Sequence, residues 1–332
     1  MTLSSLPTVV VAGGAGYIGS HMVRMLTECG YRAIVVDNLV TGHAEAARGA
    51  EFRQGDIGDA SFMAPLLREV RPQCVMHFAA ASLVGESMTA PGKYWRNNLV
   101  QTLGLLDTML ACEVKQFIFS STAAVYGNPV EVPITEQHPP KPINPYGNSK
   151  LAVEIALQDY GRAHGLRSIT LRYFNAAGAH PDGTLGERHE PETHLIPLVL
   201  QVASGRRPLI SRFGSNFPTP DGSCVRDYIH VQDLCTAHLL ALKKLEEGAA
   251  TTVYNLGNGN GHSVNEVIEA ARRVTGHPIP LRDDPPREGD PPVLVADATR
   301  ARQELGWTPQ YPEIEQIIAH AWQWEQKGMR HA

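Results

Sequence analysis

Tyr146 and Lys150 stand four residues apart in the segment Asn144-Pro-Tyr-Gly-Asn-Ser-Lys150. Asn144 suits a helix N-cap and Pro145 the first helical position, so both side chains are predicted to share one face of a helix running to about His164. An ammonium beside a phenol favours the phenolate and lowers the phenol pKa from about 10. Such a tyrosine can take a proton from a hydroxyl while a hydride leaves the same carbon. Taken alone, the spacing is common by chance and also fits a solvated pair at a helix start.

A glycine-rich turn precedes this pair in the chain. The apolar run Thr8–Ala12 predicts a buried parallel strand, and Gly13, Gly16 and Gly19 follow it directly, ahead of a helical pattern. Glycines at a strand-to-helix turn permit close approach of the backbone to a pyrophosphate, which the helix N-terminus then faces. The segment therefore predicts a dinucleotide site.

A second strand, Arg32–Asp37, ends in a carboxylate. An acid at this position can accept hydrogen bonds from the adenosine ribose and would repel a 2′-phosphate, so Asp37 predicts NAD rather than NADP. The alternative is an acid that only caps the following turn.

Alternating strand and helix patterns continue through residues 51–56, 74–80, 116–122 and 168–175. They predict an α/β fold: a Rossmann-type doubly wound parallel sheet with a smaller C-terminal α/β substrate lobe. We expect a dinucleotide-binding domain over residues 1–175, with a returning segment around 225–258, and a lobe over 176–332 that mainly binds substrate. Short helices are expected on both sides of Trp307, between residues 299 and 327.

Composition narrows the class of protein. The 332 residues carry a formal net charge of −5, which gives no general attraction to nucleic acid or to an anionic membrane. No apolar run approaches the roughly 18 residues of a membrane span, and there is no secretory pattern. The five cysteines lack zinc-type spacing. We expect a cytoplasmic protein without nucleic-acid or membrane partners.

Other chemically capable residues receive weaker interpretations. Thr122, at the end of a predicted strand, could hydrogen-bond a reacting sugar oxygen. His77 lies within an apolar strand and is interpreted as a core histidine. The run His189-Glu-Pro-Glu-Thr-His194 looks like a metal cluster, but Pro191 argues against a helical ligand pair and no zinc motif matches, so no metal is expected.

Together these motifs resemble the extended short-chain dehydrogenase/reductase family, and within it the enzymes that act on UDP-sugars. The resemblance covers nearly the whole chain. It is carried by Gly13–His21, Val36–Leu39, Gly55–Ile57, His77–Ala80, Val84–Ser87, Phe117–Ser121, Ala124–Gly127, Pro145–Lys150, Leu171–Asn175, Gly178–Pro181, Val225–Val231, Tyr254–Gly257 and Arg287–Asp290.

The resemblance implies a tightly held NAD and a 4-epimerase that interconverts UDP-glucose and UDP-galactose through a transient 4-keto sugar. It implies that Tyr146 is the general base, that Lys150 lowers its pKa and that Thr122 binds the C4 oxygen. The implied cofactor contacts are Gly13, Gly16, Tyr17, Ile18, Gly19, Asp37, Asn38, Asp56, Ile57, Phe78, Ala79, Ala80, Ser82, Asn97, Tyr146, Lys150 and Phe174. The implied substrate contacts are Thr122, Asn175, Leu195, Arg226, Arg287, Asp290 and Leu294. A homodimer is also implied, and apolar stripes near Leu99–Leu110 and Leu151–Leu157 agree with it.

Three positions depart from the family pattern. Ala12 replaces a frequent threonine, Ser82 stands where some members carry a lysine beside the cofactor, and Leu294 leaves the acceptance of N-acetyl sugars open. A 4,6-dehydratase is disfavoured because Ala123 and Ala124 replace the acidic pair that elimination needs. A 4-epimerase of another UDP-sugar (N-acetylhexosamine, pentose or uronate) and a non-catalytic dinucleotide-binding sensor remain as alternatives.

Overall fold

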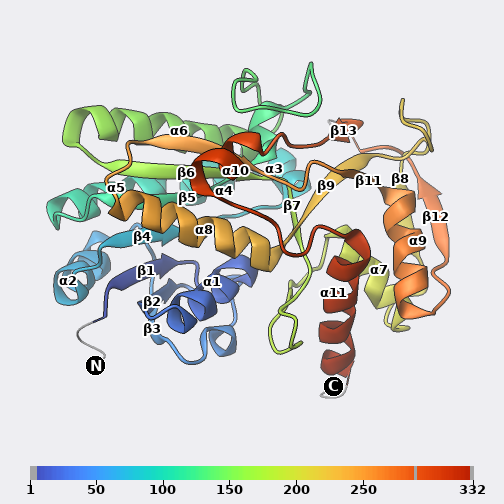
Figure 1. Cartoon of the computed structure of the whole chain (residues 1–332), viewed down its shortest axis with the longest axis horizontal. Coiled ribbons are helices and arrows are strands. Elements are labelled where there is room, and N and C mark those ends of the chain that lie inside the picture. The colour runs from blue at the N-terminus through green and yellow to red at the C-terminus, as the bar shows by residue number, and fades with distance from the viewer. Residues whose placement is uncertain (1–5, 288–289, 330–332) are drawn as a thin grey trace. The chain divides into compact units, whose positions relative to one another are not determined.

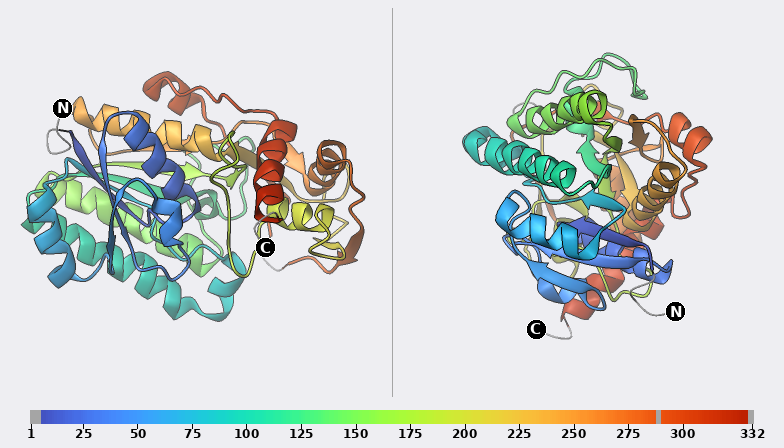
Figure 2. Two further views of the ribbon diagram at one scale, coloured as in Figure 1. Left: turned by 90° about the horizontal axis from the view of Figure 1, so that it is seen from below. Right: turned by 90° about the vertical axis from the view of Figure 1, so that its left-hand side faces the viewer.

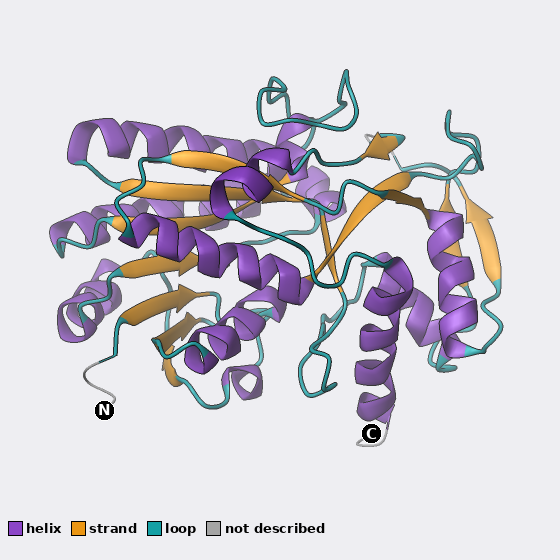
Figure 3. Ribbon diagram, in the orientation of Figure 1, coloured by secondary structure: helices purple, strands orange, loops and turns teal. Residues whose placement is uncertain are grey.

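A computed structural model describes residues 6–287 and 290–329 and divides the chain into two compact units (Figure 1). Unit 1 comprises Met1–Gly127, Pro139–Arg172 and Cys235–Tyr254; unit 2 comprises Asn128–His138, Tyr173–Leu234 and Asn255–Ala332. In both units strands and helices alternate along the chain (Figure 3). This pattern confirms the predicted α/β class.

Unit 1 is built on a seven-stranded sheet in the order β10-β6-β5-β4-β1-β2-β3. The pairs β3–β2, β2–β1, β1–β4 and β4–β5 are parallel. The strands are β1 (Thr8–Ala12), β2 (Arg32–Asp37), β3 (Glu51–Gln54), β4 (Cys74–His77), β5 (Gln116–Thr122), β6 (Arg167–Tyr173) and β10 (Thr252–Leu256). Sequence reasoning placed six of these strands and expected a returning segment around 225–258, which contains β10. Most of the seven are short apolar runs, although β3 (Glu51-Phe-Arg-Gln54) is mainly polar.

Helices cover both faces of this sheet. Figure 2 shows α1 and α8 on one face and α2, α5 and α6 on the other. Apolar side chains of α2, α5 and α6 join the strands in one core cluster that includes Leu67, Leu106 and Val153. The helices are α1 (Tyr17–Glu28), α2 (Ala60–Val70), α3 (Val84–Thr89), α4 (Pro91–Tyr94), α5 (Gln101–Ala111), α6 (Pro145–His164) and α8 (Val231–Glu246).

Unit 2 contains a small sheet in the order β11-β9-β13, with β7 also paired to β9, and a separate parallel pair β12–β8. Helices α7, α9 and α11 pack around one core cluster that includes Leu200, Ile268 and Ile318. The elements are β7 (Asn175–Ala177), α7 (Leu195–Ala203), β8 (Ile210–Phe213), β9 (Val225–His230), β11 (Gly261–Ser263), α9 (Val264–Thr275), β12 (Leu281–Asp284), β13 (Val293–Leu294), α10 (Thr299–Leu305) and α11 (Ile314–Met329).

Several boundaries differ from expectation. The second C-terminal helix is not short, because α11 has 16 residues and buries an apolar stripe against α7 and α9. The pair β8–β12 was not predicted, since its strands are polar, such as Leu281-Arg-Asp-Asp284, and lack alternation. Within residues 6–287 and 290–329, none of the helices has both the length and the apolar character needed to cross a bilayer.

Candidate active site

Helix α6 presents Tyr146 and Lys150 as the sequence predicts. The side chain of Asn144 caps the helix by accepting a hydrogen bond from the Gly147 backbone N–H at 2.8 Å, and Pro145 is the first helical residue. A Cβ at Gly147 would lie 2.5 Å from the Ala124 carbonyl oxygen, so the start of α6 sits directly against the turn that follows β5. This close packing brings Tyr146 to Thr122.

The Thr122 hydroxyl lies beside Tyr146 and lowers the pKa of its phenol, and Lys150 is buried one turn further along α6. The Lys150 ammonium donates to the Ser120 carbonyl at 2.8 Å and lies 4.8 Å from the centre of the Phe119 ring. Burial lowers the pKa of Lys150 to about 7, although the attraction of Glu154 acts in the opposite direction.

Burial raises the pKa of Tyr146, and the hydrogen bond with Thr122 lowers it by a smaller amount. This direction differs from the sequence-based expectation of a phenol acidified by its neighbouring amine. The physical reason is desolvation, which penalises the phenolate, combined with the engagement of Lys150 by the Ser120 carbonyl.

A buried ion pair behind Lys150 was missed by sequence reasoning. Arg172 on β6 donates to both carboxylate oxygens of Glu154 on α6, with N–O distances of 3.0, 3.1 and 2.5 Å. The Ser121 hydroxyl donates to the same carboxylate at 2.5 Å, and Arg172 also donates to the Tyr126 hydroxyl at 2.9 Å. The sequence carried no local signal for this pair, because Glu154 and Arg172 lie 18 positions apart on different elements. The network joins α6 to β6 one helical turn beyond Lys150.

The glycine turn between β1 and α1 is tightly built. A Cβ at Gly19 would lie 2.1 Å from the Gly13 carbonyl oxygen, and one at Gly13 would lie 2.5 Å from the Ala79 nitrogen. A Cβ at Gly16 would meet only the Gly13 oxygen, at 3.4 Å. Gly16 is the N-cap of α1, and no side chain caps that helix. The first backbone N–H groups of α1 are thus suited to an anion such as a pyrophosphate.

Asp37 lies at the end of β2, beside this turn. Its carboxylate oxygens accept hydrogen bonds from the backbone N–H groups of Ala15 (3.0 Å) and Leu39 (2.8 Å), so it also organises the turn. The next predicted cofactor residue, Asn38, donates its side-chain amide to Asp56 at 2.7 Å. Carboxylate oxygens keep acceptor capacity beyond these bonds.

The segment after β4 is held by a residue that sequence reasoning did not name. The side chain of Asn98 is buried and both accepts from and donates to the backbone of Ala81, at 2.9 and 3.0 Å. It also donates to the Ser149 hydroxyl at 3.0 Å. Its neighbour Asn97, the predicted contact, lies in a single π-helical turn between α4 and α5, a feature frequent at functional sites.

The remaining predicted cofactor residues occupy several places. Tyr17 and Ile18 form the first turn of α1, and Ile57 is buried beyond β3. Phe78, Ala79 and Ala80 directly follow β4, and the exposed Ser82 precedes α3. Phe174 lies between β6 and β7, in unit 2. His77 is a buried core histidine as predicted, with Nε2 3.0 Å from the Thr102 hydroxyl and a pKa lowered to about 3 by burial and by Lys150.

Unit 2 brings together most of the predicted substrate residues. Arg226 on β9 pairs in register with Leu294 on β13 and donates to Asp290 at 2.6 Å. Arg287 lies with its guanidinium 4.0 Å from the centre of the Phe213 ring. Asn175 is the first residue of β7, and Leu195 is the first residue of α7. Two residues of the motif Arg287–Asp290, at positions 288 and 289, lie outside the described residues.

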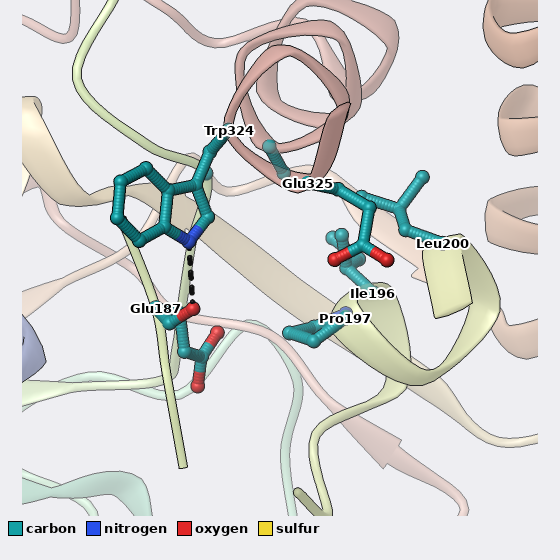
Figure 4. A pocket seen from close by; sticks show the side chains of 8 residues that line it. Glu187, Ile196, Pro197, Leu200, Trp324 and Glu325 are labelled. Carbon is teal, nitrogen blue, oxygen red and sulfur yellow. Dashed lines mark hydrogen bonds between the residues drawn. The ribbon is translucent and has the colours of Figure 1, made fainter. Parts of the chain in front are cut away.

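A small pocket of unit 2 lies between α7 and α11 (Figure 4). At the edge of the pocket the Trp324 indole N–H donates a hydrogen bond to the Glu187 backbone carbonyl at 2.9 Å. It is lined by Gly178, Glu187, Ile196, Pro197, Leu200, Ala321, Trp324 and Glu325. None of the predicted cofactor or substrate residues lines this pocket.

Two features define the class of protein. The parallel sheet has a glycine turn after β1, and a Tyr-x-x-x-Lys pair lies beside the hydroxyl at the end of β5. Together they define a dinucleotide-dependent enzyme of the short-chain dehydrogenase type. Residues 9–257 match the model of the NAD dependent epimerase/dehydratase family, and the chain belongs to that family.

The comparisons extend over nearly the full length. The chain is 51% identical over 319 residues to the UDP-glucose 4-epimerase of Halalkalibacterium halodurans, covering 96% of each chain. It is 52% identical over 320 residues to that of Streptococcus mutans, covering 95% of this chain and 96% of the relative. Among solved structures, the UDP-glucose 4-epimerase of Bifidobacterium longum in complex with NAD+ and UDP is 40% identical, with a TM-score of 0.92 over 98% of this chain and 100% of the other.

Proposed function

We propose that this protein is an NAD-dependent 4-epimerase that interconverts UDP-glucose and UDP-galactose through a transient 4-keto sugar. The observation that carries the proposal is the placement of Tyr146 beside Thr122, with Lys150 buried one turn further along the same helix. The relatives that share about half of the sequence are UDP-glucose 4-epimerases.

The residues of unit 1 fit an NAD molecule. The space above Gly16 and the uncapped N-terminus of α1 suit the pyrophosphate, and Asp37 suits the adenosine ribose. When bound, NAD supplies the acceptor for hydride from C4 and its cationic nicotinamide ring. The UDP-glucose 4-epimerase of Brucella ovis, 45% identical with a TM-score of 0.93 over 96% of this chain and 98% of that one, was crystallised in complex with NAD.

The chain's own residues provide proton transfer and orientation. Tyr146 as phenolate takes the proton of the 4-hydroxyl, and the C–H bonding pair leaves as hydride. Thr122 donates to the same oxygen and fixes its position, and Lys150, one turn further along α6, is the proposed cation that would favour the phenolate once NAD is bound. The return of hydride to the opposite face of the 4-keto sugar, with the proton returned by Tyr146, completes the inversion.

We propose that unit 2 holds the UDP moiety. The guanidinium groups of Arg226 and Arg287 match a diphosphate, and Asn175, Leu195 and Asp290 surround the nucleotide. Leu294, in register with Arg226, is the proposed determinant of sugar size. On this assignment residues 1–175 with the returning segment around 225–258 form the NAD-binding domain, and residues 176–332 mainly bind the UDP-sugar.

Replacement of the proposed base tests the activity. We expect Tyr146→Phe to lower kcat at least about 100-fold, the usual contribution of a general base, while the bound NAD is retained. Tyr160→Phe is the matched control, because Tyr160 lies on the same helix but its hydroxyl binds Asp107 on the exposed surface. A Tyr146→Phe enzyme with near-normal turnover in a coupled UDP-galactose assay would show that another group is the base.

The alternatives differ in substrate or in catalysis. Assays with UDP-glucose, UDP-N-acetylglucosamine, a UDP-pentose and a UDP-uronate distinguish the candidate sugars, with UDP-glucose expected to be preferred. A non-catalytic sensor would bind NAD and convert none of them.

We also propose a cytoplasmic homodimer. The side chains of Trp95, Val100 and Ile155 are 38%, 60% and 54% exposed on or beside α5 and α6, the helices with the apolar stripes noted above. The five cysteines, all within the described residues, form no disulfide, as expected in a reducing compartment. Light scattering at micromolar concentration tests the dimer, and a monomer mass would contradict it.

A further inference from the structure

Four side chains with metal-binding atoms converge ahead of α7, in the segment from Glu187 to His194. One nitrogen or oxygen of each of Glu187, His189, Glu192 and His194 lies within 4.8 Å of the others. From the sequence no metal is expected here, because Pro191 argues against a helical ligand pair and no zinc motif matches. The first reason does not apply to the folded chain, because the segment is a loop and brings the groups together without a helix.

The four nitrogen–oxygen distances within this cluster are close to the edges of a tetrahedral metal site. His194 Nδ1 lies 2.8 Å from Glu187 Oε1 and 3.1 Å from Glu192 Oε1. His189 Nδ1 lies 3.1 Å from Glu187 Oε1 and 3.6 Å from Glu192 Oε2. Zinc bonds of about 2.0–2.1 Å to nitrogen and oxygen give tetrahedral ligand–ligand edges of about 3.3 Å. Each imidazole Nδ1 therefore lies within 3.6 Å of an oxygen of both carboxylates, and one ligand atom from each of the four residues lies within 4.8 Å of the others.

Burial and backbone contacts hold the carboxylates in place. The side chains of Glu187 and Glu192 are only 6% and 5% exposed. Glu192 Oε1 accepts hydrogen bonds from the backbone N–H groups of Thr193 and His194 at 2.7 and 2.9 Å. The Glu187 backbone is anchored by Trp324 of α11 (Figure 4). Outer contacts of this kind orient metal ligands.

The two carboxylates of the cluster require compensating positive charge. Two buried carboxylates at this distance are stable only if positive charge compensates them. Either two protons, one on each imidazole, or one divalent ion with neutral imidazoles supplies that charge. The histidine side chains are 27% and 41% exposed, which leaves a path for an ion to enter from solvent.

We propose that Glu187, His189, Glu192 and His194 form a zinc site. Two imidazoles favour zinc over magnesium or calcium, which prefer all-oxygen sites of higher coordination number. Because the protein provides all four ligands, the site is structural rather than catalytic. Zinc entry displaces the imidazole protons and fixes the loop directly ahead of Leu195, the first residue of α7. The proposal is independent of the proposed epimerase activity.

Metal content of the full-length protein tests the proposal directly. Tag-free protein is stripped with EDTA, incubated with excess Zn²⁺, desalted and measured by mass spectrometry of the metal. We expect about one zinc per chain. The Glu187→Gln variant and the double variant His189→Asn/His194→Asn should retain less than about 0.1 equivalents.

His180→Asn is the matched control, because His180 forms an ion pair with Asp182 at 2.8 Å in the same part of the chain but has no second carboxylate in that pair. This variant should still bind one zinc. Far-UV circular dichroism and retained NAD verify that each variant is folded; where Glu187→Gln fails this check, His194→Asn alone replaces it.

Two further readouts report on geometry and role. Co²⁺ in place of zinc should give the intense visible absorption of a tetrahedral ion in the wild type and not in the double variant. Added zinc should raise the melting temperature of the wild type and leave that of the double variant unchanged. Wild-type protein without bound zinc, or a double variant with the wild-type zinc content, would overturn the proposal and leave a cluster of protonated histidines and carboxylates.

Discussion

The buried pair Glu154–Arg172 yields the sharpest prediction about stability. Its side chains are 3% and 7% exposed, and three N–O contacts join them. Removing one partner of such a pair leaves an uncompensated charge in the core, which costs about 3–5 kcal/mol. We therefore expect Glu154→Met to lower the free energy of unfolding by about 4 kcal/mol.

The double variant Glu154→Met/Arg172→Met provides the test of mechanism. With both charges gone, apolar side chains of similar volume fill the site at little cost. The hydroxyls of Ser121 and Tyr126 each lose a partner, which costs about 1 kcal/mol apiece. The double variant should thus be about 2 kcal/mol less stable than the wild type, and more stable than Glu154→Met alone.

Urea unfolding followed by tryptophan fluorescence measures these values, with NAD held at one concentration because a ligand shifts apparent stability. A Glu154→Met cost below about 1 kcal/mol would refute the reasoning. The reasoning would also be refuted if the loss of stability in the double variant equalled the sum of the losses in the two single variants, Glu154→Met and Arg172→Met, within about 0.5 kcal/mol. Such additivity would mean that the two charges do not interact.

Three further predictions concern the cofactor site and Lys150. Gly16→Ala should keep its stability, because the added Cβ meets only ordinary contact at 3.4 Å, and should lose NAD, because that Cβ occupies the space proposed for the pyrophosphate. Gly19→Ala should lose NAD and should also be destabilised by about 1–3 kcal/mol, because its Cβ overpacks against the Gly13 carbonyl. Retained NAD and unfolding curves separate the two, and a Gly16→Ala protein that keeps its NAD would contradict the assignment. Burial lowers the pKa of Lys150 to about 7, below its unfolded value, so its destabilising effect is complete below about pH 7 and fades as the pH rises towards 10. Lys150→Met should accordingly raise the melting temperature at pH 6.5 and raise it less at pH 9.5, while abolishing activity; an equal shift at both pH values would contradict the pKa direction. Asp37→Asn should keep one side-chain acceptor for the turn and weaken NAD binding in a fluorescence titration, and unchanged affinity would argue against a ribose contact.

The elements that the sequence predicted well are those whose signals are local. Helix α6 begins after its predicted Asn144 cap and ends at His164, where the sequence analysis expects its end, and β1 and β2 have the predicted bounds. Gly165 adopts a φ of 69°, which favours glycine. Each of these features depends on neighbouring residues alone.

Features that depend on distant residues escaped prediction. Arg172 looked like one polar residue in an apolar strand, and only the packing of β6 against α6 gives it Glu154 as a partner. The direction of the Tyr146 pKa was predicted wrongly, because the i,i+4 spacing carries no information on how far the phenol is desolvated or on the bond from Lys150 to the Ser120 carbonyl. The metal-site interpretation of Glu187 to His194 was set aside partly because Pro191 disfavours a helix, but these residues lie in a loop, to which that argument does not apply.

The sequence by itself determined the class of fold, the cofactor turn and the identity of the Tyr146–Lys150 pair, because strand runs, glycines and helix caps act over a few residues. Only the tertiary structure decided the electrostatic environment of that pair and the convergence of two histidines with two glutamates. Burial and charge compensation are properties of the packed chain. They arise only when segments far apart in the sequence, or the residues of a folded loop, come together and exclude water from the groups between them.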